Sequence, residues 1–350
     1  MKRAASALVD RLVEEGLLVS APSAAVGRVE IGNVTTDSRF VKPGSLFCAV
    51  RGVAADGHQY LRAAAEAGAA LALVESPNAS VDLPQVVVSD GRKAAAFAAA
   101  EFYGDPWKEL ELIGITGTNG KTTTAAILRH LLAKRDPAAS MGTLGLVGPD
   151  GQPVPGTEGL TTPGPAQFAG EIRRLVERGV RAVAMEVSSH ALDQERVAAA
   201  TFAGAIFTNL SRDHLDYHSD LESYRQAKLK LVDLIRPGGV LAANVDDAAW
   251  EGIGSAGVHL VRFGTRGRGE VQAEGITFRN GGIEWHLHTP SCTAPVHLPL
   301  FGTYNVYNAL GAAAILWGLG WTSDVIAEGL RNLPQVPGRL ERVVAASGPA

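Results

Sequence analysis

The chain is long enough for about two domains, and its composition is that of a folded globular protein. It has 350 residues, of which 46% are hydrophobic and 19% are charged, whereas one domain typically has about 100–200 residues. The 32 basic and 36 acidic residues give a formal net charge of -4. A protein that binds nucleic acid through an excess of positive charge is therefore excluded.

Neither the cysteines nor the apolar segments indicate secretion or membrane insertion. Cys48 and Cys292 are far apart and lie outside any metal-ligand spacing, which predicts a reducing, cytoplasmic setting. The longest apolar stretch, residues 309–321, is shorter than the roughly 20 residues of a membrane-spanning helix. The initial sequence MKRAASALVDRLVEEG predicts an amphipathic helix rather than a signal peptide, because acidic residues interrupt its apolar run.

The first part of the chain predicts a small α/β domain. Between residues 31 and 102, the short apolar runs SLFCAV, LALVE and QVVVS alternate with Ala-rich helical stretches. The segment GDPWKEL, residues 104–110, contains Gly and Pro and precedes a new apolar run. We therefore predict two domains, residues 1–106 and 107–350.

The second part predicts a mostly parallel sheet. The expected strands ELIGIT, VRAVAMEV, AGAIFTNL and GGVLAANV are separated by helical segments. After Val258 the pattern changes to HLVRFGT, AEGITFRNGGIEWHLHT and APVHLPL, in which Asn-Gly-Gly signals a hairpin. We expect an antiparallel extension there, followed by helices over residues 305–319 and 323–333.

Residues 113–124, IGITGTNGKTTT, follow a predicted strand and open a predicted helix, which is the context of a phosphate-binding loop. Its glycines let backbone N–H groups approach oxyanions, and Lys121 supplies a charge for the β- and γ-phosphates of a nucleotide. Thr122 can offer its hydroxyl to a magnesium ion, and ATP is the favoured nucleotide. Because Ile115 occupies the first glycine position of the strict motif, an ordinary Gly-rich turn is the alternative.

Two further segments carry acidic and histidine side chains. Glu186 ends a predicted strand, and ligands bind at the carboxyl edge of a parallel sheet, so it can hold magnesium or simply cap the next turn. The segment 208–220, TNLSRDHLDYHSD, contains Asp213, His214, Asp216 and His218. His214 and His218 would share a helix face. Oxygen-rich surroundings favour magnesium over zinc, and for His218 we prefer a structural role.

The segment LESYRQAKLKLVDLI, residues 221–235, predicts a helix with a lysine on its apolar face. The side chains that share this face are Leu221, Tyr224, Lys228 and Leu231. A buried lysine needs a partner or a chemical role. A lysine that extends its ammonium group to the surface is the alternative.

Taken together, these residues resemble the Mur ligase family, and within it the UDP-N-acetylmuramoyl-tripeptide synthetases. The motifs that carry the resemblance are TTDSR at 35–39, ADGHQY at 55–60, GITGTNGKTTT at 114–124, TTP at 161–163, EVSSHAL at 186–192, TNLSRDHLDYH at 208–218, AK at 227–228, YNVYNAL at 304–310 and GRLE at 338–341. Their order is more specific than any one of them.

The resemblance implies an ATP-dependent ligase of peptidoglycan synthesis with magnesium as cofactor. It would add meso-diaminopimelate, or L-lysine, to the D-glutamate of UDP-N-acetylmuramoyl-L-alanyl-D-glutamate through an acyl phosphate. A uridine-nucleotide-binding domain and an ATP-binding central domain are expected, in a cytoplasmic monomer. The alternatives are another Mur-type ligase and a two-domain protein that binds a nucleotide or UDP-sugar without ligation.

Family members continue past GRLE with segments similar to DYAHTP and DNPR, and neither string occurs here. We therefore expect that the C-terminal Rossmann-like domain is absent, that amino-acid specificity cannot be read, and that the chain alone ligates little or nothing.

The resemblance also implies roles for individual residues. ATP would be bound by Gly117, Thr118, Asn119, Gly120, Lys121, Thr122, Thr123, Asn305, Asn308 and Arg339. The substrate would be bound by Thr36, Ser38, Val53, Ala54, Ala55, Thr161, Thr162, Ser188, Gln194 and Arg196. Catalysis would use Lys121, Glu186, His214 and Lys228, and magnesium would be held by Thr122, Glu186, His214 and Lys228, the lysine as a carbamate. Leu160 stands where some members have an asparagine, so one substrate contact differs.

Overall fold

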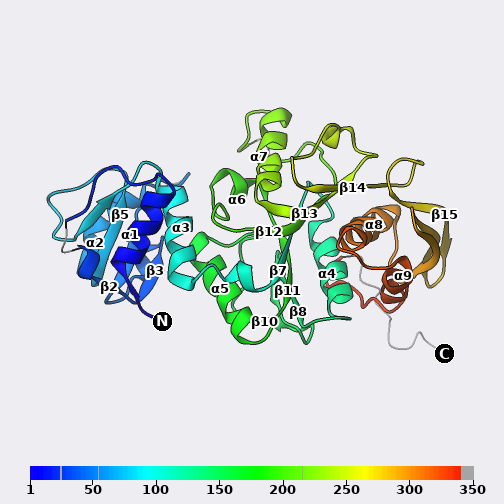
Figure 1. Ribbon diagram of the computed structural model, residues 1–350, viewed down its shortest axis with the longest axis horizontal. Coiled ribbons are helices and arrows are strands. Elements are labelled where there is room, and N and C mark those ends of the chain that lie inside the picture. Colours follow the sequence, from blue (N-terminus) through cyan, green and yellow to red (C-terminus); the bar gives the residue numbers. More distant parts are fainter. Residues whose placement is uncertain (24–25, 54, 215, 340–350) are drawn as a thin grey trace, which may run out of the picture. The chain divides into compact units, whose positions relative to one another are not determined.

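The computed structural model describes residues 1–23, 26–53, 55–214 and 216–339, and its internal contacts divide the chain into two units (Figure 1). Unit 1 comprises Met1–Glu109, Thr162–Arg178 and His190–Ala200, and unit 2 comprises the rest. Two segments from the middle of the chain thus belong to unit 1, one of which forms a helix that packs on a helix of the N-terminal segment. The boundary at residues 106–107 stays a prediction.

Unit 1 contains a four-stranded parallel sheet. Its strands are β3 (Asn33–Thr35), β4 (Ser45–Cys48), β5 (Ala69–Val74) and β6 (Gln85–Val87), and its helices are α1 (Ala5–Glu14), α2 (Leu61–Glu66), α3 (Gly91–Tyr103) and α5 (Pro165–Glu177). The strands β1 (Arg3–Ala4) and β2 (Glu30–Ile31) form a separate antiparallel pair. The predicted N-terminal helix is present as α1, with Ala5, Leu8 and Leu12 buried.

The local sequence of helix α3 explains where this helix begins, which residues it buries and where it ends. Its N-cap Asp90 accepts hydrogen bonds from the backbone N–H groups of Arg92 and Lys93. Its alanines are buried on most sides of the helix, which packs on β3, β4 and β5 and on the helices α1 and α5. The helix ends at Gly104, whose φ of 70° lies in the left-handed region that favours glycine.

Unit 2 is built on an eleven-stranded sheet with the order β10-β9-β8-β11-β7-β12-β13-β14-β15-β16-β17. Its strands are β7 (Glu111–Thr116), β8 (Ala138–Gly142), β9 (Gly145–Val147), β10 (Pro153–Val154), β11 (Ala182–Glu186), β12 (Phe202–Phe207), β13 (Ile235–Asn244), β14 (His259–Gly264), β15 (Val271–Arg279), β16 (Gly282–Thr289) and β17 (Cys292–Leu298). The pairs from β8 to β15 are parallel, so the mostly parallel sheet is confirmed.

The antiparallel extension is also confirmed, with two differences. The hairpin β15–β16 turns at Asn280–Gly281, as the sequence predicts, and β17 continues it. However, β14, which we expected within the extension, pairs in parallel with β13. A second antiparallel group, β8–β9–β10, lies at the opposite edge. Its strands β9 and β10 are too short to show a clear alternation in the sequence.

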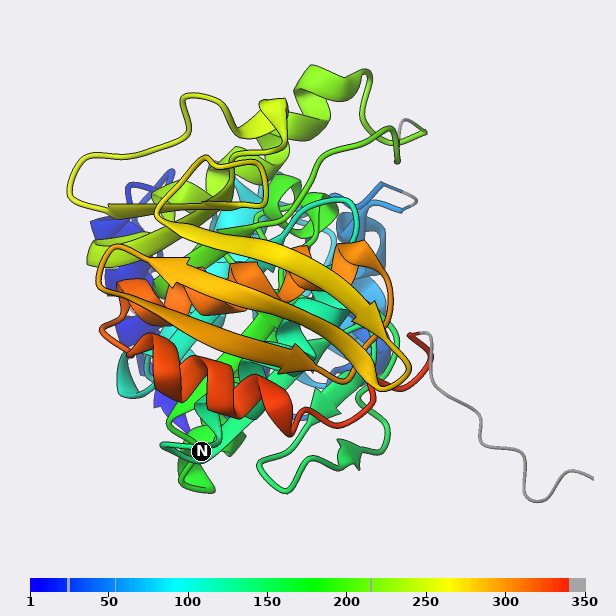
Figure 2. The same cartoon turned by 90° about the vertical axis from the view of Figure 1, so that its right-hand side faces the viewer.

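Helices cover both faces of the parallel part of this sheet. Along β7, Ile113 and Ile115 join the core under α4 (Lys121–Leu132), α8 (Thr303–Gly318) and α9 (Ser323–Arg331), whereas Gly114 faces Leu231 of α7 (Leu221–Asp233). Since successive residues of a strand point to opposite faces, α7 covers the other face. Figure 2 shows β15, β16 and β17 running side by side next to α8 and α9. The short helix α6 (Ser189–Asp193) follows β11.

This topology brings the segments that carry the candidate site residues of unit 2 to one edge of the sheet. The parallel strands β7, β11, β12 and β13 all end at the carboxyl edge of the sheet, where α/β proteins bind ligands. None of the helices in the described ranges has the length and apolarity needed to cross a membrane. Both cysteines are free thiols, Cys48 buried and Cys292 exposed.

We expect Phe47→Ala to destabilise unit 1 by about 3–5 kcal/mol, because Phe47 is fully buried in the core of that unit and the truncation leaves a cavity. Phe40→Ala is the matched control, since Phe40 is 64% exposed, and should change stability by no more than about 0.5 kcal/mol. Urea denaturation measures both. Equal effects would contradict the assignment of this core.

Candidate functional site

The loop between β7 and α4 has the backbone of an anion-binding site. Gly117 and Gly120 have φ values of 142° and 88°. A Cβ atom would lie 2.0 Å from Thr208 Oγ1 at the first and 2.3 Å from Asn308 Oδ1 at the second, so only glycine fits. Among the described residues, no side chain caps the N-terminus of α4, which leaves its first N–H groups and the helix dipole for an oxyanion.

The loop is braced by the segment that follows β12. Asn209 Oδ1 accepts a hydrogen bond from the N–H of Asn119 (3.0 Å), and Asn209 Nδ2 donates to the carbonyl of Asn119 (3.0 Å). Thr208 Oγ1 donates to the same carbonyl (2.7 Å). Within the loop, Lys121 Nζ donates to the carbonyl oxygens of Gly117 (2.9 Å) and Thr118 (2.8 Å).

Glu186 is a buried carboxylate at the end of β11, only 2% exposed. Its Oε2 accepts hydrogen bonds from Thr122 Oγ1 (3.0 Å) and Thr143 Oγ1 (3.2 Å), and its Oε1 from the N–H of Thr143 (2.8 Å). Burial raises the pKa of Glu186, and the bonds from Thr143 and Thr122 oppose that rise. Arg339 also reaches this group, because its Nη2 donates to Thr122 Oγ1 (3.1 Å).

Lys228 comes to the phosphate loop from α7. It is 1% exposed, and its Nζ donates to the carbonyl of Gly117 (3.0 Å) and lies 4.3 Å from the centroid of the Tyr224 ring. Burial, followed by the charge of Lys121, lowers the pKa of Lys228 to about 6. The prediction that Lys228 faces the apolar side is confirmed. Leu221, expected on the same face, is instead 42% exposed.

The acidic and histidine residues after β12 do not form the expected helix. The described residues between Ser211 and Asp220 lie in loops and turns, and α7 begins at Leu221. His214 has a φ of 52°, and its ring lies 3.6 Å from a carboxylate oxygen of Asp213. His218 is buried, with Nε2 3.0 Å from Ser189 Oγ. The described residues contain no group of three His, Cys, Asp or Glu side chains able to hold a metal ion.

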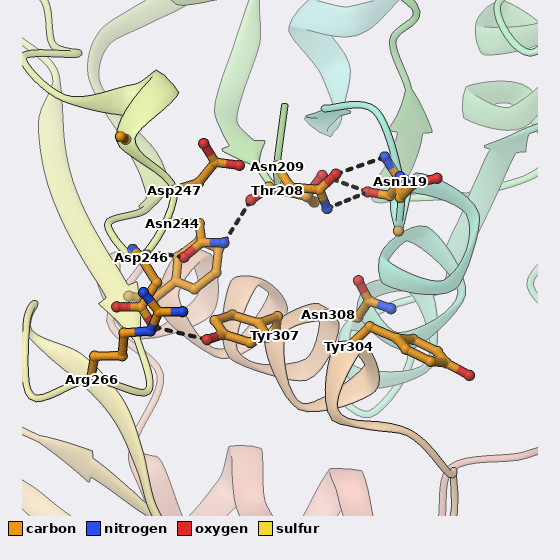
Figure 3. A pocket seen from close by; sticks show the side chains of 13 residues that line it. Asn119, Thr208, Asn209, Asn244, Asp246, Asp247, Arg266, Tyr304, Tyr307 and Asn308 are labelled. Atoms are coloured by element: carbon orange, nitrogen blue, oxygen red, sulfur yellow. Dashed lines mark hydrogen bonds between the residues drawn. The ribbon is translucent and has the colours of Figure 1, made fainter. Parts of the chain in front are cut away.

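A cavity of about 390 Å³ adjoins the phosphate loop (Figure 3). It lies between the ends of β12, β13 and β14 and the start of α8, and it is lined by Asn119, Gly120, Thr208, Asn209, Asn244, Asp246, Asp247, Ala248, Phe263, Arg266, Tyr304, Tyr307 and Asn308. Asn305, which we expected at the nucleotide, is not among them. It is 2% exposed and accepts a hydrogen bond from Asn308 Nδ2 (2.9 Å). Asn305 therefore orients the side chain of Asn308, which lines the cavity, without lining the cavity itself.

Several lining residues had no role in the sequence analysis. Asp246 Oδ2 accepts hydrogen bonds from the N–H of Thr265 (2.7 Å) and from the hydroxyl of Tyr307 (3.0 Å), which ties the end of β13 to β14 and α8. Asn244 Nδ2 donates to the carbonyl of Thr208 (2.8 Å). The available signal for Asn244 and Asp246 was their position just after the apolar run VLAA, residues 240–243, at the carboxyl edge that also holds Glu186.

The expected substrate residues fall in both units. In unit 1, Arg196 donates to Gln194 Oε1 (2.7 Å) and to the carbonyl of Thr162 (2.9 Å), so these three lie together. In unit 2, Thr161 Oγ1 lies 3.3 Å from Thr143 Oγ1, which itself binds Glu186. The others are Thr36 and Ser38, which are half-buried near β3, Val53 and Ala55, which are exposed, and Ser188, which is half-buried after β11. Ala54 lies outside the described residues.

Comparisons with known proteins give a consistent result. Residues 115–316 match the model of the Mur ligase middle domain, and residues 30–103 match that of the Mur ligase family catalytic domain. A UDP-N-acetylmuramoyl-L-alanyl-D-glutamate--2,6-diaminopimelate ligase of Geobacter sulfurreducens is 43% identical over 324 residues, which cover 90% of this chain and 63% of that protein. A ligase of the same name from Geobacillus thermodenitrificans is 39% identical over 91% of this chain and 66% of its own length.

Solved structures support the fold. A structure of a UDP-N-acetylmuramoyl-L-alanyl-D-glutamate--2,6-diaminopimelate ligase has a TM-score of 0.82 at 24% identity, over 98% of this chain and 69% of that one. A MurF ligase from Thermotoga maritima in complex with ADP has a TM-score of 0.62 at 19% identity, over 88% of this chain and 67% of that one. The chain spans less than two thirds of the length of the Geobacter sulfurreducens relative.

We expect the free energy of unfolding to depend on pH through Lys228. Its pKa is about 6 in the folded protein, against an ordinary 10.5, so unfolding takes up a proton between these values and the contribution of Lys228 rises with pH. Lys228→Met should therefore be more stable than the original protein near pH 7, and this advantage should shrink toward pH 10. Denaturation in buffers free of carbon dioxide, with exposed Lys134→Met as control, measures it. If the difference in unfolding free energy between Lys228→Met and the original protein does not change with pH, the Lys228 amine is charged in the folded protein.

Proposed function

Because the chain belongs to the Mur ligase family, we propose that it binds ATP and a UDP-linked substrate and carries the carboxylate-activating part of an ATP-dependent ligase of peptidoglycan synthesis. The carboxylate is the γ-carboxylate of D-glutamate in UDP-N-acetylmuramoyl-L-alanyl-D-glutamate, and the incoming amine belongs to diaminopimelate. The observation that supports this most is the meeting of Lys121, Lys228 and the Thr122–Glu186 pair at one loop. The cytoplasmic location and the monomeric state remain predictions from the sequence.

The nucleotide would lie along the carboxyl edge of the sheet in unit 2. The N–H groups at the start of α4 and the ammonium of Lys121 would hold the β- and γ-phosphates. The nucleoside would extend into the cavity of about 390 Å³, past Asn308. Arg339, which reaches Thr122 Oγ1, would add a second positive charge beside the phosphates.

The proposed chemistry brings two anions together. The substrate carboxylate attacks the γ-phosphorus, an oxygen–phosphorus bond forms, and ADP leaves with the electrons of the broken bond. The amine then attacks the acyl phosphate carbon, loses a proton and expels phosphate. Lys121 and Arg339 reduce the repulsion in the first step, and fixed positions supply much of the remaining acceleration.

The donor set at Glu186 fits magnesium. Thr122 Oγ1 and the Glu186 carboxylate are adjacent oxygen donors, the type that magnesium prefers, and their protein partners hold them in place. We propose that these two residues, with His214 and carbamylated Lys228, hold the cation, which would neutralise phosphate charge when bound. With its pKa near 6, the Lys228 amine is mostly neutral at pH 7.5 and can form a nitrogen–carbon bond to carbon dioxide with loss of one proton.

Each unit contains residues that we propose for substrate binding. In unit 1, Thr36, Ser38 and residues 53–55 would bind the uridine nucleotide, and the linked group Thr162, Gln194 and Arg196 would bind the sugar-peptide part. In unit 2, Thr161 and Ser188 would contact the peptide, and the hydroxyl contact between Thr161 and Thr143 leads to Glu186.

We expect the chain to bind UDP-N-acetylmuramoyl-L-alanyl-D-glutamate more tightly than UDP-N-acetylmuramic acid when a non-hydrolysable ATP analogue and magnesium are present, because only the first ligand carries the peptide that Arg196 and its partners would hold. Titration calorimetry with both ligands measures the difference. Equal affinities would contradict the assignment of the peptide-binding residues, and binding of ATP alone would favour a protein that only binds nucleotide.

Lys121→Ala should weaken binding of magnesium-ATP by about tenfold or more, since a hydrogen bond to a charged phosphate is worth about 1.5–3 kcal/mol. Lys108→Ala is the matched control, because Lys108 is an exposed lysine of unit 1. Unchanged affinity in Lys121→Ala would show that the loop does not bind the phosphates.

A further inference from the structure

Tyr224 is a completely buried tyrosine that contacts the phosphate loop and Lys228 at the same time. It is 0% exposed, it lies in the first turn of α7, and Lys228 follows four residues later on the same helix face. Its hydroxyl lies 3.3 Å from Thr118 Oγ1, and its ring lies 4.3 Å from Lys228 Nζ.

The number of protons at Thr118 is consistent with a hydrogen bond donated by the Tyr224 hydroxyl. A threonine hydroxyl donates one hydrogen bond and accepts two. Thr118 Oγ1 donates to the carbonyl of Ser211 (3.3 Å) and accepts from the N–H of Ser211 (2.9 Å). With its own proton on that carbonyl, Thr118 Oγ1 has one acceptor position left, and the hydroxyl proton of Tyr224 at 3.3 Å can fill it.

These contacts form a closed ring. Thr118 is bonded to Gly117 through the main chain, the carbonyl of Gly117 accepts from Lys228 Nζ (3.0 Å), Lys228 lies against the ring of Tyr224, and Tyr224 returns to Thr118. The carbonyl oxygens of Gly117 and Thr118 also accept hydrogen bonds from Lys121 Nζ. A shift of any member would therefore move the loop and the lysine together.

We propose that Tyr224 is a positioning residue that joins the phosphate loop to Lys228, so that the nucleotide and the lysine are held in one fixed arrangement. A role in core packing alone would be served by phenylalanine, because a buried hydroxyl costs free energy unless it finds a partner. The hydroxyl of Tyr224 is aimed at the phosphate loop, and the ring covers the one lysine of α7 that is fully buried. This inference rests on the proposed function for nucleotide binding and for the carbamate on Lys228.

Two variants and one control test the proposal on the full chain. Tyr224→Phe removes the hydroxyl and keeps the ring, whereas Tyr224→Leu removes both. Phe202→Leu is the control, because Phe202 is an equally buried aromatic residue at the start of β12, the strand end opposite Thr208. One readout is the dissociation constant of magnesium-ATP by calorimetry. The other is the carbamate signal after addition of ¹³C-bicarbonate by NMR, assigned through its loss in Lys228→Arg.

We expect Tyr224→Leu to bind magnesium-ATP about tenfold more weakly, because the loop loses its fixed position, and to lose most of the carbamate signal. Tyr224→Phe should keep the carbamate signal and bind ATP about two- to tenfold more weakly, the cost of one neutral hydrogen bond. Phe202→Leu should lower the melting temperature as much as Tyr224→Leu does and leave both readouts unchanged.

Equal changes in Tyr224→Leu and Phe202→Leu would overturn the proposal, since both readouts would then follow core stability. If Tyr224→Leu does not fold, Tyr224→Phe still decides, because original affinity in that variant overturns the proposed link to Thr118. If the original chain does not bind ATP, the proposed function is overturned as well. If only the Tyr224 variants lose ATP binding, the proposed function is not contradicted.

Discussion

Two lysine amines meet at a single carbonyl oxygen, and this is the constraint on which the site depends. The oxygen of Gly117 accepts a hydrogen bond from Lys121 Nζ at 2.9 Å and from Lys228 Nζ at 3.0 Å. Two ammonium ions that share one acceptor in a buried place would repel each other strongly. The lower cost is to keep one of them neutral, and burial together with the charge of Lys121 lowers the pKa of Lys228 to about 6. In the proposed function, the pair would supply one cation for phosphate and one neutral amine.

The parallel sheet makes this arrangement possible. Strands β7, β11 and β12 are neighbours in the sheet and run in the same direction, so the phosphate loop, Glu186 and the Thr208–Asn209 segment all follow strand ends at one edge. The close approach of these segments requires glycine at positions 117 and 120, where any side chain would collide with Thr208 or Asn308. Helix α7 then brings Lys228 from the other face of the same sheet, above Gly114, which leaves room for Leu231.

The sequence was sufficient where the signal is local. A strand, two glycines and Lys-Thr in succession predict the glycine loop that the structure places between β7 and α4, and alternating runs around Asn280 predict the hairpin. It was insufficient where partners are distant in sequence. The helical pattern of His214 and His218 gave no sign that a turn precedes α7, and nothing near Asn305 shows that it lies behind Asn308. Leu221 has the spacing of the buried face but lies at the first position of α7 and is 42% exposed. The contacts of residues 162–178 with the N-terminal segment likewise depend on tertiary packing, which residue spacing does not encode.

Two charged groups of the site, Lys121 and Glu186, already have protein partners. Burial lowers the pKa of Lys121 and raises that of Glu186, yet both have protein partners, the loop carbonyls for the lysine and Thr122 and Thr143 for the glutamate. A polyanionic ligand or a cation that arrives here exchanges existing hydrogen bonds and does not have to order free side chains, which reduces the entropic cost of binding. Because Thr122 contacts both Glu186 and Arg339, a ligand that takes the hydroxyl of Thr122 must change the surroundings of both. The surroundings of Arg339 and of the buried Glu186 carboxylate are therefore coupled through one hydroxyl group at the first turn of α4.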